Sequence, residues 1–160
     1  MTIYFTKESL GEYKKTVTGL ENKLRKIQAT SQEVVESGDC WHDNAGYDLL
    51  IEDLRVQNRR LNDAHKLLNE AKIIEYPSSV DETVVIGTRA TISLDGVRRE
   101  YEIVAYGDED GKTRILYSSP IAAALIGHKI DGDFEANING KLREIEILKI
   151  EPLKKNNRQT

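Results

Sequence analysis

The chain lacks most of the features that would place it in a membrane or in an oxidising compartment. Cys40 is the only cysteine among 160 residues, which excludes an intramolecular disulfide and fits a reducing compartment. Charged residues follow Met1 too closely for a signal peptide, and no apolar run approaches the length of a membrane span. The sequence therefore predicts a cytoplasmic protein with no membrane partner.

A large net charge is also missing. The formal net charge is −4, so no global field attracts nucleic acid, and an electrostatic partner must meet a local patch. Charged residues make up 31% of the chain and hydrophobic residues 39%, a balance typical of a soluble protein with a large surface for its core. The length suffices for two small domains.

The N-terminal half is patterned for two helices. Apolar residues recur at alternating spacings of three and four from Leu10 to Val34, and a second series runs from Leu50 to Ala71. Each series is a heptad seam that one helix cannot bury alone. Thr6 is a predicted N-cap, and the segment from Ser37 to Asn44 predicts a short turn between antiparallel neighbours. We therefore expect an antiparallel coiled-coil finger over residues 1–76.

After Tyr76-Pro77 the period changes to two. Short alternating runs separated by glycine-containing turns predict strands. These runs are 84–86, 89–94, 101–106, 114–117, 134–138 and 142–150. Ser119-Pro120 opens a short predicted helix that ends before Gly127. We expect a mostly antiparallel sheet with one short helix over residues 77–154, and a flexible tail over 155–160.

Charge is sorted along the predicted hairpin. Seven acidic residues, and no lysine or arginine, lie from Glu33 to Asp53 around the turn. Farther from the turn the balance reverses, with Arg55, Arg59 and Arg60 on the second helix. The simplest interpretation is a solvated helical surface. Because like charges crowded at one end repel each other, we favour a task for the acidic tip inside a cavity of a larger partner.

Asp39 and Asp43, on either side of the turn, are candidate metal ligands. Mg²⁺ prefers oxygen ligands and keeps several waters, so two carboxylates suit an ion held mostly by another protein. Such an ion polarises a phosphate and lowers the pKa of a bound water. The competing interpretation makes Asp43 a helix cap and Asp39 a turn residue. Trp41 likewise has two interpretations, a contact with a base or a channel wall, or packing over the turn.

Two motifs resemble the GreA/GreB family of bacterial transcription elongation factors. The stretch Gly38 to Tyr47 reads Gly-Asp-Cys-Trp-His-Asp-Asn-Ala-Gly-Tyr, and the family's tip motif reads Gly-Asp, two variable residues, Glu-Asn-Ala-Glu-Tyr. The stretch Ser118 to Lys129 is similar to the family's Ser-Pro-Ile-Ala-x-x-Leu-Ile-Gly-Lys. Gly132-Asp133 and the Asn139-Gly140 turn also match, so the resemblance covers nearly the whole chain.

The resemblance implies an α+β protein, with a coiled-coil finger joined to an FKBP-like domain without isomerase chemistry. In the family this domain binds the rim of the secondary channel of RNA polymerase, which points to Ser119, Pro120 and Ile121. The finger reaches the active site, where its tip acids help the polymerase hold Mg²⁺, and these acids map to Asp39 and Asp43. The implied partners are bacterial RNA polymerase and the 3′ end of backtracked RNA. The resemblance also implies that this protein is a monomeric accessory factor, is not itself an enzyme, and binds no metal on its own.

The tip departs from the family pattern in three respects. Three residues, not two, separate its acids, Asp43 is one methylene shorter than Glu, and Gly46 replaces a further acid.

Two hypotheses follow, stimulation of RNA cleavage or regulation of the polymerase in the same channel without cleavage. A coiled-coil adaptor unrelated to transcription conflicts with the motifs, and a peptidyl-prolyl isomerase conflicts with the few aromatic residues of the C-terminal half. Candidate contacts to the RNA or the channel wall are Trp41, Arg55, Arg59 and Arg60.

Overall fold

The chain packs as two units. The computed structural model describes residues 2–36 and 45–153. Proximity of Cα atoms groups residues 2–3 with 10–36 and 45–71 as a first unit, and Tyr4–Ser9 with residues 72–153 as a second. No helix in these described ranges is long and apolar enough to cross a membrane.

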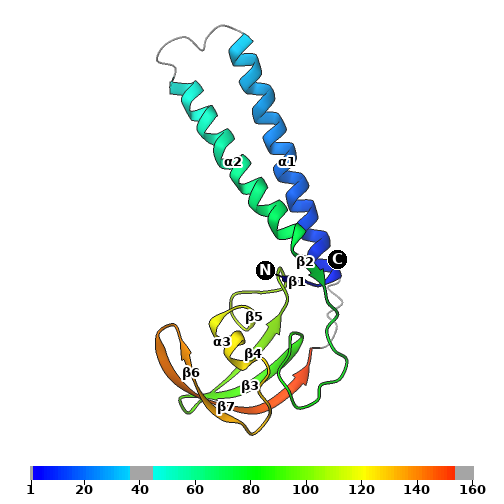
Figure 1. The fold of residues 1–160 in the computed structure, drawn as a ribbon, viewed down its shortest axis with the longest axis vertical. Helices are drawn as coiled ribbons and strands as arrows, with labels where there is room; N and C mark the ends of the chain where they lie inside the picture. Colours follow the sequence, from blue (N-terminus) through cyan, green and yellow to red (C-terminus); the bar gives the residue numbers. More distant parts are fainter. Residues whose placement is uncertain (1, 37–44, 154–160) are drawn as a thin grey trace. The chain divides into compact units, whose positions relative to one another are not determined.

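The first unit is a helical hairpin. Figure 1 shows α1 (Lys7–Glu36) and α2 (Ala45–Asn69) running alongside each other in opposite directions. The buried residues that the structure describes in this unit all occupy predicted seam positions. They are Leu10, Val17, Leu24, Gln57 and Ala64. Glu21 Oε1 and His65 Nε2 lie 3.1 Å apart, a polar contact between the two helices. The predicted seams are therefore the buried sides of the helices.

Thr6 caps α1, as its sequence position predicts. The backbone N–H of Ser9 donates to Thr6 Oγ1 at 3.1 Å, and the N–H of Thr6 donates to Ser9 Oγ at 3.1 Å. Both residues are buried. The reciprocal bonds satisfy backbone N–H groups that the first turn of a helix leaves without an internal acceptor.

The second unit is built on a five-stranded sheet in the order β5-β4-β3-β7-β6. Its strands are β3 (Thr88–Leu94), β4 (Val97–Val104), β5 (Arg114–Leu116), β6 (Asp133–Ile138) and β7 (Lys141–Pro152). One short helix, α3 (Pro120–Leu125), joins this sheet, and β1 (Ile3–Phe5) pairs separately with β2 (Ala71–Ile73). The expected fold class is confirmed, a helical hairpin and an FKBP-like sheet with one short helix.

Two details of the strands differ from expectation, and a third, one parallel pair, lies within the predicted mostly antiparallel sheet. The segment 84–86 is not a strand, because Val84 exchanges backbone hydrogen bonds of 2.9 Å with Gly127 and His128, in the loop after α3. β5 pairs with β4 in parallel, whereas the other pairs of this sheet are antiparallel. Strands β1 and β2 were not predicted, because strands of three residues are too short to show an alternating pattern.

One face of the sheet carries the core. Strand register places Ile92 of β3 opposite Ile147 of β7, so the two side chains share a face. Ala122 and Leu125 of α3 belong to the same cluster, and all four side chains are fully buried. The cluster holds α3 against the sheet.

Tyr76 anchors the segment before β3 within the second unit. Its hydroxyl donates to Asp108 Oδ2 at 2.6 Å and accepts from the N–H of Ala105 at 3.0 Å. Burial of the phenol, together with its bond to Asp108, raises the pKa of Tyr76. Gly87, with φ 93°, lies so close that a Cβ there would be 2.7 Å from Tyr76 and Pro77. Packing as well as backbone conformation therefore requires glycine at this position.

Candidate docking site

The N-terminal end of α3 presents the segment that the sequence assigns to partner binding. Ser119 is the N-cap, its side chain accepts from the N–H of Ala122 at 3.4 Å, and Pro120 occupies the first turn. Pro120 is exposed and Ile121 is half-buried. Because Ala122 and Leu125 anchor α3 in the core, this segment is fixed in position while part of it remains accessible.

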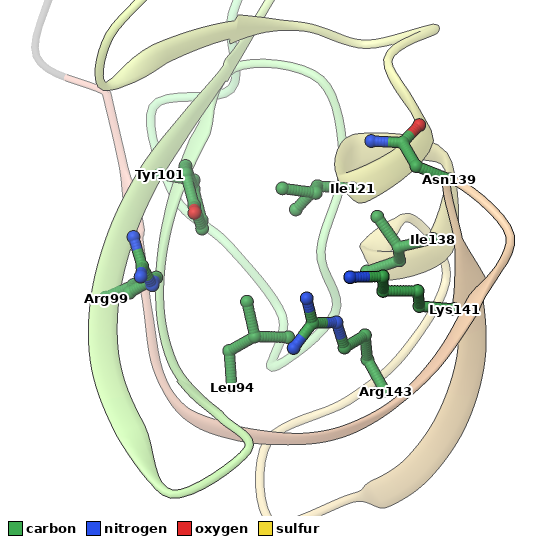
Figure 2. Close-up of a pocket in the computed structure, with 8 residues that line it drawn as sticks. All are labelled: Leu94, Arg99, Tyr101, Ile121, Ile138, Asn139, Lys141 and Arg143. Carbon is green, nitrogen blue, oxygen red and sulfur yellow. The ribbon is translucent and has the colours of Figure 1, made fainter.

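An open pocket of about 380 Å³, the α3 pocket, lies beside this segment on the core face of the sheet. Leu94, Tyr101, Ile121 and Ile138 give it an apolar lining, and Asn139 completes one side. Figure 2 shows these side chains around a common space, with Ile121 reaching it from α3. Since Ile121 belongs to both, the segment and the pocket form one continuous surface.

Three cationic side chains also line the α3 pocket. They are Arg99, Lys141 and Arg143. In Figure 2 the charged ends of Lys141 and Arg143 point inward from β7. Arg143 forms an ion pair with Asp95, which also accepts the N–H of Glu144 at 3.1 Å, and these two bonds lower the pKa of Asp95. The side chains of Arg99 and Lys141 have no hydrogen bond or ion pair with any residue that the structure describes. The pocket thus offers two positive charges to a partner.

Sequence reasoning missed these cations, although the strands carry a signal for them. Register places Arg99 opposite Ile92 and Lys141 opposite Ile138, so both charges lie on the core face. In the sequence Lys141 and Arg143 are in phase with the buried Ile145. When charged residues near the end of a strand point to the same face as its buried residues, they indicate that the core ends there in a polar, accessible margin, where pockets form.

The predicted arginine contacts lie on the surface of α2. Arg55, Arg59 and Arg60 are exposed, and the spacing of four places Arg55 and Arg59 on one side of the helix. Arg55 Nη1 lies 3.6 Å from Glu52 Oε2 in an exposed pair, which contributes little to stability. Arg59 and Arg60 have no ion pair within the described part of the chain. Their charges are therefore accessible to a partner.

The predicted tip residues Asp39, Trp41 and Asp43 fall in 37–44, outside the described residues. Asp53, an acid of the predicted cluster that lies within α2, accepts from Gln57 Nε2 at 2.9 Å. Within residues 2–36 and 45–153, no group of three or more His, Cys, Asp or Glu is arranged to hold a metal ion. The magnesium role of Asp39 and Asp43 stays a prediction.

Comparison with known proteins identifies the family. A family model described as "Transcription elongation factor, GreA/GreB, C-term" matches residues 79–152, which include the docking segment and the α3 pocket. The transcription elongation factor GreA of Thermomicrobium roseum is 33% identical over 112 residues, which cover 69% of this chain and 71% of that protein. The GreA of Halalkalibacterium halodurans is 28% identical over 150 residues, covering 92% of this chain and 95% of that protein. Among solved structures, GreA factor homolog 1 (Gfh1) of Thermus thermophilus is similar with a TM-score of 0.46 and 20% identity, over 94% of this chain and 99% of that chain. The chain belongs to the GreA/GreB family of transcription elongation factors.

Proposed function

We propose that this protein binds RNA polymerase through Ser119, Pro120 and Ile121 and brings its acidic hairpin turn through the secondary channel to stimulate cleavage of backtracked RNA. Family membership supports the partner. The observation that carries the docking role is the accessible Pro120 on a helix whose following residues are fixed in the core. In this proposal the protein is an accessory factor, and the polymerase performs the chemistry.

The charges of the hairpin suit this task. Asp39 and Asp43 offer carboxylate oxygens, the ligands that Mg²⁺ prefers, to an ion held jointly with the polymerase. Bound Mg²⁺ polarises a phosphate and lowers the pKa of a coordinated water. The exposed Arg55, Arg59 and Arg60 are available to the phosphates of the displaced RNA end or to the channel walls.

The docking role is tested by introducing charge at the α3 segment. The double variant Pro120→Asp/Ile121→Asp is expected to lose RNA polymerase in a pull-down, because an apolar contact is replaced by buried charge. Since Ile121 is half-buried, the single variant Pro120→Glu, at an exposed position, separates binding from folding. Circular dichroism confirms the fold of each variant, and retained affinity in both contradicts the docking role.

The tip role is tested on stalled, backtracked polymerase complexes. Asp39→Asn and Asp43→Asn are each expected to remove stimulated cleavage of the RNA 3′ end while binding stays nearly intact. The reason is that an amide lacks the anionic charge of the metal ligand. Full activity of Asp43→Asn would instead assign Asp43 to helix capping, because Asn caps as well as Asp.

The arginines are tested by reversing their charge. Arg59→Glu/Arg60→Glu is expected to weaken polymerase binding and to reduce its dependence on salt, because fewer phosphate contacts release fewer counterions. If affinity and salt dependence are both unchanged, this part of α2 serves only as scaffold.

A second candidate function rests on the three departures of the tip from the family motif. Here the protein occupies the same channel but modulates or inhibits transcription without stimulating cleavage. Wild-type protein that alters pausing or initiation yet leaves backtracked RNA uncut supports this function. Deleting Cys40 restores the usual spacing, so a gain of cleavage in that variant shows that the longer turn holds its acids out of position.

A further inference from the structure

We infer that the α3 pocket recognises an acidic segment of the polymerase, in which a carboxylate side chain is flanked by an aliphatic one. The inference rests on the proposed function for the identity of the partner, and it adds the chemistry of the contact. The pocket shares Ile121 with the docking segment, so one partner surface covers both.

Charge selects the carboxylate. The whole chain has a formal net charge of −4, yet three cations line this pocket. Of these three cations, Arg143 is paired with Asp95. Arg99 and Lys141 have no partner in the described part of the chain. A local positive site on an acidic protein favours an anionic partner and repels a basic one.

The apolar lining favours a peptide over RNA. Leu94, Ile121 and Ile138 line the same pocket as the cations. A phosphate backbone offers no aliphatic group to this wall, whereas an aliphatic side chain next to a glutamate or aspartate covers it. An aliphatic side chain bound on this wall also excludes water from the neighbouring carboxylate, which strengthens its ion pairs with Arg99 and Lys141.

The chemistry is tested first without the polymerase. Isotope-labelled full-length protein is titrated with the peptide acetyl-Leu-Glu-Glu-Leu-amide, its neutral match acetyl-Leu-Gln-Gln-Leu-amide, and a short single-stranded RNA, while amide NMR shifts are recorded. The acidic peptide alone is expected to shift the signals of Arg99, Tyr101 and Lys141. Equal shifts with the neutral peptide, stronger shifts with RNA, or no shifts at the pocket overturn the inference.

The second measurement uses core RNA polymerase and a matched control. Arg99→Gln/Lys141→Gln is expected to weaken binding at least tenfold and to reduce its salt dependence, since charged hydrogen bonds are lost. Arg98→Gln controls for the loss of one positive charge from β4. It changes the position next to Arg99, which pairs with Ser93 on the opposite face, and is expected to bind as wild type. Both changed side chains in the pocket are exposed, so the fold is retained.

The two proposals fail in different ways. If Pro120→Glu abolishes binding but Arg99→Gln/Lys141→Gln matches wild type, the pocket inference is wrong and the docking role stands. If the wild type does not bind polymerase at all, the proposed function is wrong, and the peptide titration alone decides what the pocket recognises.

Discussion

The two units of the molecule bury their apolar residues to different depths. In the sheet unit Ile92, Ile103 and Ile147 are 0% exposed. In the hairpin the most buried apolar residue is Val17, at 4%. The seam of the hairpin also includes a polar residue, Gln57, at 3% exposure, whose Oε1 has no hydrogen-bond partner among the described residues. One unit therefore has a layered core, and the other a thin, partly polar one.

This difference decides how loss of function is to be interpreted in each unit. A charge reversal at exposed Arg59 touches no core, so a binding defect there reports a lost contact. A change at Ile121 reaches a side chain packed against the core cluster, so the same defect can arise from unfolding. Surface residues of the hairpin are thus the cleaner probes, and residues of α3 need a test of folding beside each binding test.

The largest expected effect comes from opening the deep core. Ile147→Ala is expected to lower the free energy of unfolding of the sheet unit by about 2–5 kcal/mol, because it removes buried methyl groups and leaves a cavity. Leu61→Ala, at a half-buried seam position, is expected to cost the hairpin less, since part of that side chain already contacts water. Native-state hydrogen exchange reports both units separately, and equal losses contradict the comparison.

Replacing the polar residue of the hairpin seam with an apolar one is expected to raise the free energy of unfolding. Gln57→Leu is expected to stabilise the hairpin by about 1 kcal/mol, because a buried oxygen without a partner carries a desolvation cost. The bond from Gln57 Nε2 to Asp53 is also lost, but Asp53 is half-buried and can accept from water instead. Its matched control, Gln28→Leu, changes an exposed position of α1 and is expected to stay within about 0.5 kcal/mol of wild type. Urea unfolding followed by circular dichroism measures both. A loss of stability at Gln57→Leu would show that the amide specifies the pairing of the helices.

The sequence predicted the elements whose signals are local. The heptad spacing located both helices, Thr6 marked the start of α1, and Ser119-Pro120 marked the start of α3. The β-branched run at 84–86 looked like a strand, but a loop distant in sequence takes its hydrogen bonds. The local sequence pattern does not show that a distant loop takes these hydrogen bonds, and it does not indicate that β5 pairs with β4 in parallel.

In the candidate site too, contiguous motifs were visible in the sequence and residues brought together by the fold were not. The docking role of Ser119, Pro120 and Ile121 is a prediction from a contiguous motif at 118–129. The α3 pocket was not, because Arg99 and Lys141 come from different strands, and only strand register places both on the core face. Asp39 and Asp43 rest on the motif alone, since they lie outside the described residues.

A smaller effect is expected where the chain enters α1. Thr6→Ala is expected to cost about 1 kcal/mol, because the N–H of Ser9 loses its acceptor. Thr6→Ser keeps the hydroxyl and is expected to retain most of the stability. Amide exchange at the first turn of α1 measures the change. Equal protection in the two variants contradicts a capping role and assigns Thr6 to packing.

The smallest expected effect is a pH dependence confined to the sheet unit. Asp95 forms an ion pair with Arg143 and accepts the backbone N–H of Glu144. These two interactions lower the pKa of Asp95 in the folded state. Asp95 therefore stabilises the fold above its unfolded pKa of about 4, and this stabilisation is lost as the pH falls through the lower folded pKa. Asp95→Asn removes the charge yet suits the turn, because Asn tolerates the positive φ of 50° at this position.

The stability difference between wild type and Asp95→Asn is accordingly expected to shrink as the pH is lowered from neutral to about 3. It is expected to stay small throughout, since the side chains of Asp95 and Arg143 are 39% and 40% exposed and salt screens such pairs. Hydrogen exchange should place the difference in β3 and β4 and leave the hairpin unchanged. The absence of any difference at neutral pH would show that Asp95 stabilises the turn by accepting the N–H of Glu144, as Asn also can, and not through its charge.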